Sequence, residues 1–89
     1  MTDREITLRR LHMRSIRRGM KEMDLILTRF AEETLPGLDD EGLALYEQML
    51  SENDQDLYIW ITGQQPAPEP FTALIAQIAE ATRGGLIAS

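Results

Sequence analysis

The chain contains no cysteine and a single histidine, and these two shortages exclude several kinds of site. Without thiols it has no disulfide, no thiolate metal site and no cysteine nucleophile. One histidine, His12, cannot build a histidine-rich metal centre, and we interpret it as a surface residue on an arginine-rich helix. A glycine-rich phosphate loop of the common nucleotide-binding types is also missing. The sequence therefore argues against an enzyme.

Long apolar runs are missing as well. No stretch approaches the roughly 18–20 apolar residues of a membrane span, so we expect no membrane insertion. Asp3 and Glu5 precede any apolar run, and we therefore expect neither a signal peptide nor a basic transit peptide. The composition, 43% apolar and 27% charged, is typical of a globular protein. From these features we expect a cytoplasmic protein, which we take to be bacterial.

Strand signals are scarce, whereas helical periodicity covers most of the chain. No window alternates apolar and polar residues for long, and no Asn-Gly or Asp-Gly hairpin signal occurs. A chain of 89 residues supports one modest core. We predict an all-α fold, a small five-helix bundle that forms a single domain over residues 1–89, ordered over about 3–83 with a flexible tail at 84–89. The expected helices cover about residues 3–17, 20–34, 39–53, 54–62 and 70–83.

Several apolar side chains recur at helical spacing and predict the buried faces. In the second helix these are Met23, Ile26, Leu27 and Phe30; in the third, Leu43, Tyr46, Met49 and Leu50; in the fifth, Leu74, Ile75 and Ile78. Short carboxylates cap helices well, so we expect Asp39 to cap the third helix and Asp54 to cap the fourth. Gly63 should end the fourth helix.

The charge is divided unevenly along the chain. Residues 1–30 carry a net +4 and residues 31–89 a net −10, within a total of −6. The basic third can steer a partner, or it can pair with the acidic remainder across the fold. A small helical nucleic-acid-binding protein that uses the arginines of the first helix is the alternative function. Because an acidic body repels a polyanion, we prefer a solvated helix face and expect no nucleic acid.

The most unusual local feature is residues 17–24, R-R-G-M-K-E-M-D. Gly19 removes side-chain bulk where two helices meet, so another backbone could approach closely; we expect it to have an ordinary φ at the start of the second helix. Arg18 and Glu22 are four residues apart and share a face if that helix extends back. Glu22 also lies where the helix dipole favours a carboxylate. Spacing alone favours a plain helix junction over a functional site.

The same residues resemble a known family. R-G-M-K-E at residues 18–22 resembles the R-G-x-x-E motif of the succinate dehydrogenase FAD-assembly factors, and residues 17–27 are similar to that family's R-R-G-M-x-E-x-D-x-x-L. Residues 54–60, D-Q-D-L-Y-I-W, resemble its second landmark, D-x-D-L-[YF]-x-W. The resemblance extends over roughly residues 5–83.

The resemblance implies a five-helix bundle that binds the flavoprotein subunit of succinate dehydrogenase, and in some bacteria that of fumarate reductase. It implies a chaperone that promotes covalent attachment of FAD to a histidine of that subunit. It further implies that the histidine attacks the 8α-methyl carbon of the flavin in a largely self-catalysed reaction, while the helper holds the favourable conformer by preferential binding. We expect no FAD bound tightly by this chain itself.

The resemblance also implies site residues. Arg18, Gly19 and Glu22 match the motif: Gly19 would permit close approach of the partner, and Glu22 would place a carboxylate near the reacting groups. The residues expected to contact the partner are Arg17, Arg18, Gly19, Lys21, Glu22, Asp24 and Tyr58. We expect Trp60 to fill the core.

Overall fold

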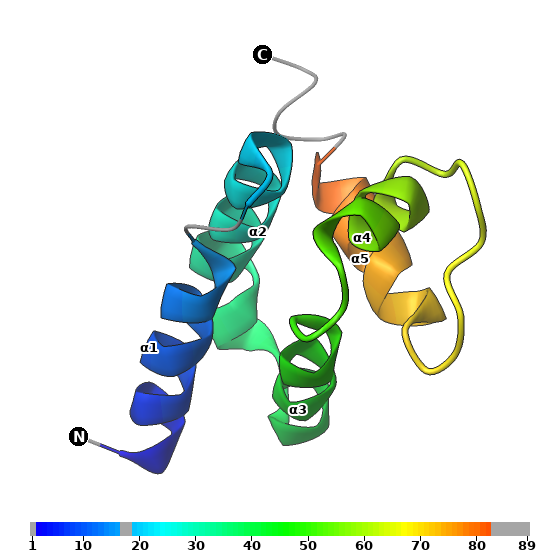
Figure 1. Ribbon diagram of the computed structural model, residues 1–89. Helices are drawn as coiled ribbons and strands as arrows, with labels where there is room; N and C mark the ends of the chain where they lie inside the picture. Colours follow the sequence, from blue (N-terminus) through cyan, green and yellow to red (C-terminus); the bar gives the residue numbers. More distant parts are fainter. Residues whose placement is uncertain (1, 17–18, 83–89) are drawn as a thin grey trace.

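The computed structural model describes residues 2–16 and 19–82. Over these residues the chain forms five α-helices and no strand, as predicted (Figure 1). The helices are α1 (Asp3–Ser15), α2 (Lys21–Glu33), α3 (Asp40–Met49), α4 (Asp54–Ile61) and α5 (Thr72–Thr82), and a short 3₁₀ helix, η1 (Leu35–Gly37), follows α2. The predicted tail at 84–89 lies outside the described residues.

Three helices begin at a side-chain cap. The hydroxyl of Thr2 accepts from the amide of Glu5, and a carboxylate oxygen of Asp39 accepts from the amide of Gly42 at 2.8 Å. The prediction for Asp39 is thus confirmed. For α4 the prediction was wrong, because Asn53 is the cap: its side-chain oxygen accepts from the amide of Gln55. Asp54 follows it as the first residue of α4.

The predicted ends of two helices were also wrong. Helix α3 ends at Met49 because the amides of Ser51 and Glu52 bond to carbonyls only three residues back, which tightens the chain into a turn. Helix α5 begins at Thr72 rather than at Pro70, after a turn in which the amide of Phe71 donates to the carbonyl of Pro68.

Helix α2 is the central element of the fold. It packs against α1, α4 and α5, and Figure 1 shows it between α1 and the pair formed by α4 and α5. Its predicted apolar face is buried, and so are the faces predicted for α3 and α5. The buried apolar residues are Leu11, Met23, Ile26, Leu27, Phe30, Ala31, Leu35, Leu43, Tyr46, Met49, Leu50, Leu57, Ile61, Phe71, Leu74, Ile75 and Ile78.

One polar pair lies inside this core. The hydroxyl of Ser15 donates to the carbonyl of Leu11 at 2.7 Å and lies 2.7 Å from the hydroxyl of Tyr46. Since a serine hydroxyl has one proton, Tyr46 is the donor in the second bond. The ring of Tyr46 stacks on Phe30, with centroids 5.7 Å apart. The last turn of α1 is thereby joined to α3, and the sequence had given no sign that Ser15 is buried.

Candidate functional site

The motif of residues 17–24 lies at the junction of α1 and α2. Arg17 and Arg18, two of the expected contact residues, lie outside the described residues. The N-cap of α2 is Met20, whose side chain makes no capping hydrogen bond, and Lys21 and Glu22 are the first two residues of the helix. The amides of this first turn therefore lack a side-chain acceptor at the N-cap, and the acidic Glu22 suits the positive end of the dipole.

The start of α2 presents polar groups outward from a firm base. Gly19, Lys21 and Glu22 are exposed, whereas Asp24 is half-buried. Met23 is completely buried and fixes the rotation of the first turn. Glu22 makes no hydrogen bond or ion pair with another described residue, so its carboxylate is available to a partner.

Gly19 has an ordinary φ, as predicted, but it precedes the N-cap of α2 and is not the first residue of the helix. Its φ lies outside the left-handed region, and a Cβ built on it would meet its nearest neighbour, an oxygen of Asp54, at 3.9 Å. The amide of Gly19 donates to the same oxygen, Oδ2 of Asp54, at 3.2 Å. Among the described residues, neither backbone strain nor crowding requires glycine at this position.

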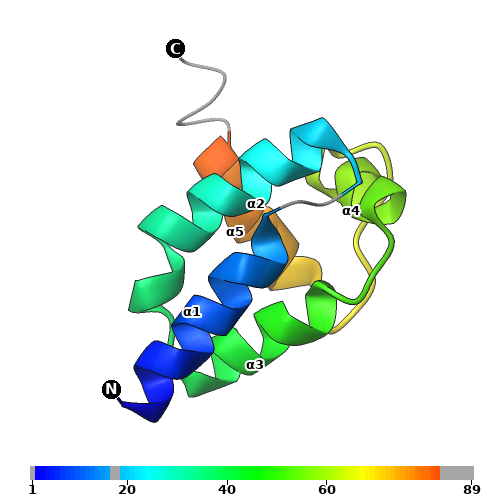
Figure 2. The same cartoon turned by 60° about the vertical axis from the view of Figure 1, so that its left-hand side comes forward.

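The two sequence landmarks meet in space. Figure 2 shows the start of α2 beside α4, and the hydrogen bond from Gly19 to Asp54 joins residues 35 positions apart. A hollow of about 440 Å³ lies between the two helix starts and is lined by Gly19, Met20, Asn53, Asp54 and Gln55. Tyr58 is half-buried and does not line this hollow.

Trp60 lies at the edge of the core, so the prediction that it fills the core was wrong. It is half-buried, stacks on Phe71 with centroids 6.5 Å apart, and lines a hollow of about 470 Å³ between α4, the connector and α5. In the short α4, Leu57 and Ile61 take the inward positions four residues apart. Trp60 is about 100° round the helix from Ile61 and so turns partly outward.

Two arginines of α1, Arg10 and Arg14, are paired with α3. Arg10 lies 3.0 Å from one carboxylate oxygen of Glu47, and Arg14 lies 3.4 Å from the other. Arg14 also reaches the hydroxyl of Ser51 at 3.4 Å. Both arginines thus contact a carboxylate of α3. In a nucleic-acid-binding helix they would instead be free to contact phosphates.

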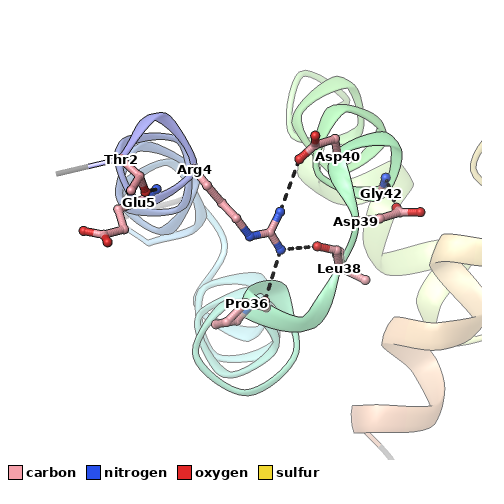
Figure 3. Close-up of polar contacts among 8 residues, drawn as sticks. All are labelled: Thr2, Arg4, Glu5, Pro36, Leu38, Asp39, Asp40 and Gly42. Atoms are coloured by element: carbon pink, nitrogen blue, oxygen red, sulfur yellow. Dashed lines mark hydrogen bonds and ion pairs between the residues drawn. The ribbon is translucent and has the colours of Figure 1, made fainter.

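Arg4 makes the same kind of link at the other end of α1. Figure 3 shows its guanidinium between a carboxylate oxygen of Asp40, at 3.3 Å, and the carbonyls of Pro36 and Leu38. The Pro36 contact measures 3.1 Å. These three arginines, Arg4, Arg10 and Arg14, form what we call the arginine ladder. Their pairing supports the reading in which the basic third binds the acidic remainder, and nothing in the described part of the chain favours the nucleic-acid alternative.

His12 is half-buried against α2 rather than fully on the surface, with Nε2 3.8 Å from Oε1 of Glu32.

Across residues 2–16 and 19–82, every helix is too short or too polar to cross a membrane.

Curated proteins similar to the chain share one name. The mitochondrial succinate dehydrogenase assembly factor 2 of Drosophila grimshawi is 37% identical over 71 residues, which cover 78% of this chain and 48% of that protein. Its namesake in Meyerozyma guilliermondii is 46% identical over 59 residues, or 66% of this chain and 44% of that protein. That of Schizosaccharomyces japonicus is 45% identical over 60 residues, covering 67% and 42%. The chain spans about half the length of these relatives.

These relatives overturn the expected location. They are named as mitochondrial proteins and come from flies and yeasts, which contradicts the prediction of a bacterial cytoplasmic protein. That prediction rested on the composition of the first residues and of the chain as a whole. A folded domain of this composition can work in either compartment, so composition could not decide between them.

The family itself is established by a match over most of the chain. A family model described as the flavinator of succinate dehydrogenase matches residues 9–82. The matched region includes the exposed start of α2, the start of α4 and the hydrogen bond between them. The chain therefore belongs to the family of succinate dehydrogenase flavinators.

Proposed function

We propose that the chain is an assembly factor that binds the flavoprotein subunit of succinate dehydrogenase and promotes covalent attachment of FAD to it. The observation that carries the proposal is the family match over residues 9–82, which includes both landmarks of the site. The names of the relatives agree with it. The factor acts by binding and has no catalytic turnover of its own; FAD is held by the partner and is not bound tightly here.

The proposed contact surface is the exposed start of α2. Glycine costs backbone entropy, and no contact or backbone angle in the described part of the chain explains it at position 19. Close approach of a partner backbone does explain it. The proposed contact residues are Arg17, Arg18, Gly19, Lys21, Glu22, Asp24 and Tyr58.

Glu22 is the residue in this surface with the clearest chemical part. Its carboxylate is exposed and unpaired among the described residues, so folding makes little use of it. In the complex it would lie near the histidine and the flavin methyl carbon that become joined. There it can accept a hydrogen bond and hold the partner in the conformer that reacts.

The test is a reconstitution with purified components. The flavoprotein subunit lacking flavin is incubated with FAD, with or without the chain, and covalent flavin is measured by fluorescence of the denatured protein. The wild-type chain should raise the yield, and Glu22→Ala should remove most of that gain. A first-turn carboxylate contributes only about 0.3–1 kcal/mol to folding, so the variant should stay folded.

Glu41 offers a matched control. It is the second residue of α3, as Glu22 is of α2, and it is equally exposed. Glu41→Ala should act like the wild type. If the wild-type chain gives no gain, or if both variants behave alike, the proposal is wrong. A parallel assay with the flavoprotein subunit of fumarate reductase determines whether that subunit is a second partner.

A further inference from the structure

We infer that Asp54 is a positioning residue for the proposed contact surface: by holding the amide of Gly19 it fixes the direction from which the chain enters α2. The inference rests on the proposed function. It assigns a role to a residue that the sequence analysis had treated as a helix cap. Asp54 lies in the second landmark, 35 residues from the motif that it holds.

Asp54 does not cap α4, because the neighbouring residue Asn53 is the N-cap. The side-chain oxygen of Asn53 accepts from the amide of Gln55 at 2.8 Å and so caps α4. The carboxylate of Asp54 instead reaches across to the amide of Gly19 at 3.2 Å. An ionised acceptor makes a stronger hydrogen bond than a neutral one, so this contact is well suited to fixing a backbone.

Apart from this hydrogen bond, the described contacts that orient the start of α2 are packing contacts. Gly19 has no side chain, and Met20 provides no cap, although its half-buried side chain packs against the core. Met23, buried in the core, fixes the rotation of the helix but lies four residues beyond Gly19. A shift of Gly19 would move the surface that the partner approaches, and misplacement by about 1 Å can cost a hundredfold in a reaction that depends on orientation.

The experiment compares Asp54→Ala, Asp54→Asn and Asp56→Ala. Asparagine keeps an oxygen that can accept from Gly19, whereas alanine does not. Asp56 is the matched control, since it is an exposed acidic residue in the same first turn of α4. Two readouts are taken: the proton shift and solvent exchange of the Gly19 amide by NMR, and the chain concentration that gives half-maximal flavin attachment.

With Asp54→Ala we expect faster exchange and an upfield shift of the Gly19 amide, together with about a tenfold higher half-maximal concentration. Asp54→Asn should bring the Gly19 amide shift back toward that of the wild type. It should bring the exchange rate and the half-maximal concentration to within about threefold of the wild-type values. Asp56→Ala should change neither. Rescue by asparagine separates positioning from a general loss of stability, which thermal unfolding of each variant checks.

The inference is overturned if Asp54→Ala alters the Gly19 amide but leaves flavin attachment unchanged. It is equally overturned if the amide does not respond, or if asparagine fails to rescue a folded protein. Failure of the proposed function looks different: the wild-type chain itself would give no gain in covalent flavin, while the amide readout would still report the hydrogen bond.

Discussion

Position 19 separates the demands of folding from those of binding at the scale of one residue. Because Gly19 has an ordinary φ and a Cβ there would make only an ordinary contact, at 3.9 Å, Gly19→Ala should be neutral or stabilise the fold by about 0.4–1 kcal/mol. Gly19→Arg should likewise leave the melting temperature nearly unchanged but block binding to the flavoprotein. A melting curve paired with a pull-down measures both effects.

The control for this bulky change is Gly37→Arg. Gly37 ends η1, has nothing within 4 Å of a built Cβ, and has no left-handed φ. It lies away from the start of α2, so the variant should bind normally. Normal binding by a folded Gly19→Arg protein would remove this junction from the interface.

Trp60 tests a second distinction, between the core and its edge. Truncation of a fully buried tryptophan costs about 3–5 kcal/mol, but Trp60 is half-buried, so Trp60→Ala should cost less than that. Leu57 lies in the same helix and is completely buried, so Leu57→Ala should lower the free energy of unfolding by about 2–5 kcal/mol. Urea unfolding of both variants gives the comparison; a larger loss at Trp60 than at Leu57 would place its ring in the core after all.

At the scale of elements, the sequence predicted most where a pattern repeats. The apolar spacing of α2 gave its buried face correctly, and Asp39 marked the start of α3. The failures are single contacts. Asn53 and Asp54 are both good caps, and only the fold decides that one caps while the other reaches Gly19. The burial of Ser15 depends on a tyrosine 31 residues away, which no local pattern contains.

The candidate site was predictable in part for the same reason. Its motif could be recognised in the sequence. The contact between the two landmarks could not, because it depends on the tertiary structure. The pairing of α1 with α3 was one of two readings of the charge split, and composition could not choose between them. Ionic contacts such as Arg10 to Glu47 depend on which helices are neighbours, and the fold supplies that.

The link between α1 and α3 makes a prediction about salt. The side chains of Arg10, Arg14 and Glu47 are 38–51% exposed, and pairs of this kind contribute about 0.2–1 kcal/mol each. Glu47→Gln should therefore lower the melting temperature by a few degrees at low ionic strength. The difference should shrink in about 1 M salt, where charges are screened within about 3 Å. A difference that persists in salt would mean that Glu47 acts through packing.

At the scale of the whole molecule, the two ends differ in how their helix starts are capped. At one end of the molecule, Arg4 joins the start of α1 to the start of α3 (Figure 1). At the other end, the start of α2 lies beside α4 (Figures 1 and 2). At the first end, α1 and α3 each begin at a side-chain cap, Thr2 and Asp39. The second leaves the first turn of α2 without a side-chain cap. This contrast supports the proposal that the partner binds at the second end.

Hydrogen exchange should map that contrast in solution. Amides in an uncapped first turn exchange quickly, so residues 21–23 should gain protection when the flavoprotein is added. The first turn of α3, where Asp39 caps Gly42, should show no gain. Glu22→Ala should weaken the gain at α2. Protection that appears at α3 instead would place the partner at the opposite end.

The arginine ladder also has a consequence for how the protein is made. Arg14 leaves the ribosome 33 residues before its partner Glu47. At about 5–20 residues per second this delay lasts roughly 2–7 s, during which Arg10 and Arg14 lack the Glu47 carboxylate that they contact in the finished fold. The link between α1 and α3 is therefore one of the later contacts to form during synthesis, and it has to wait until α3 has been made.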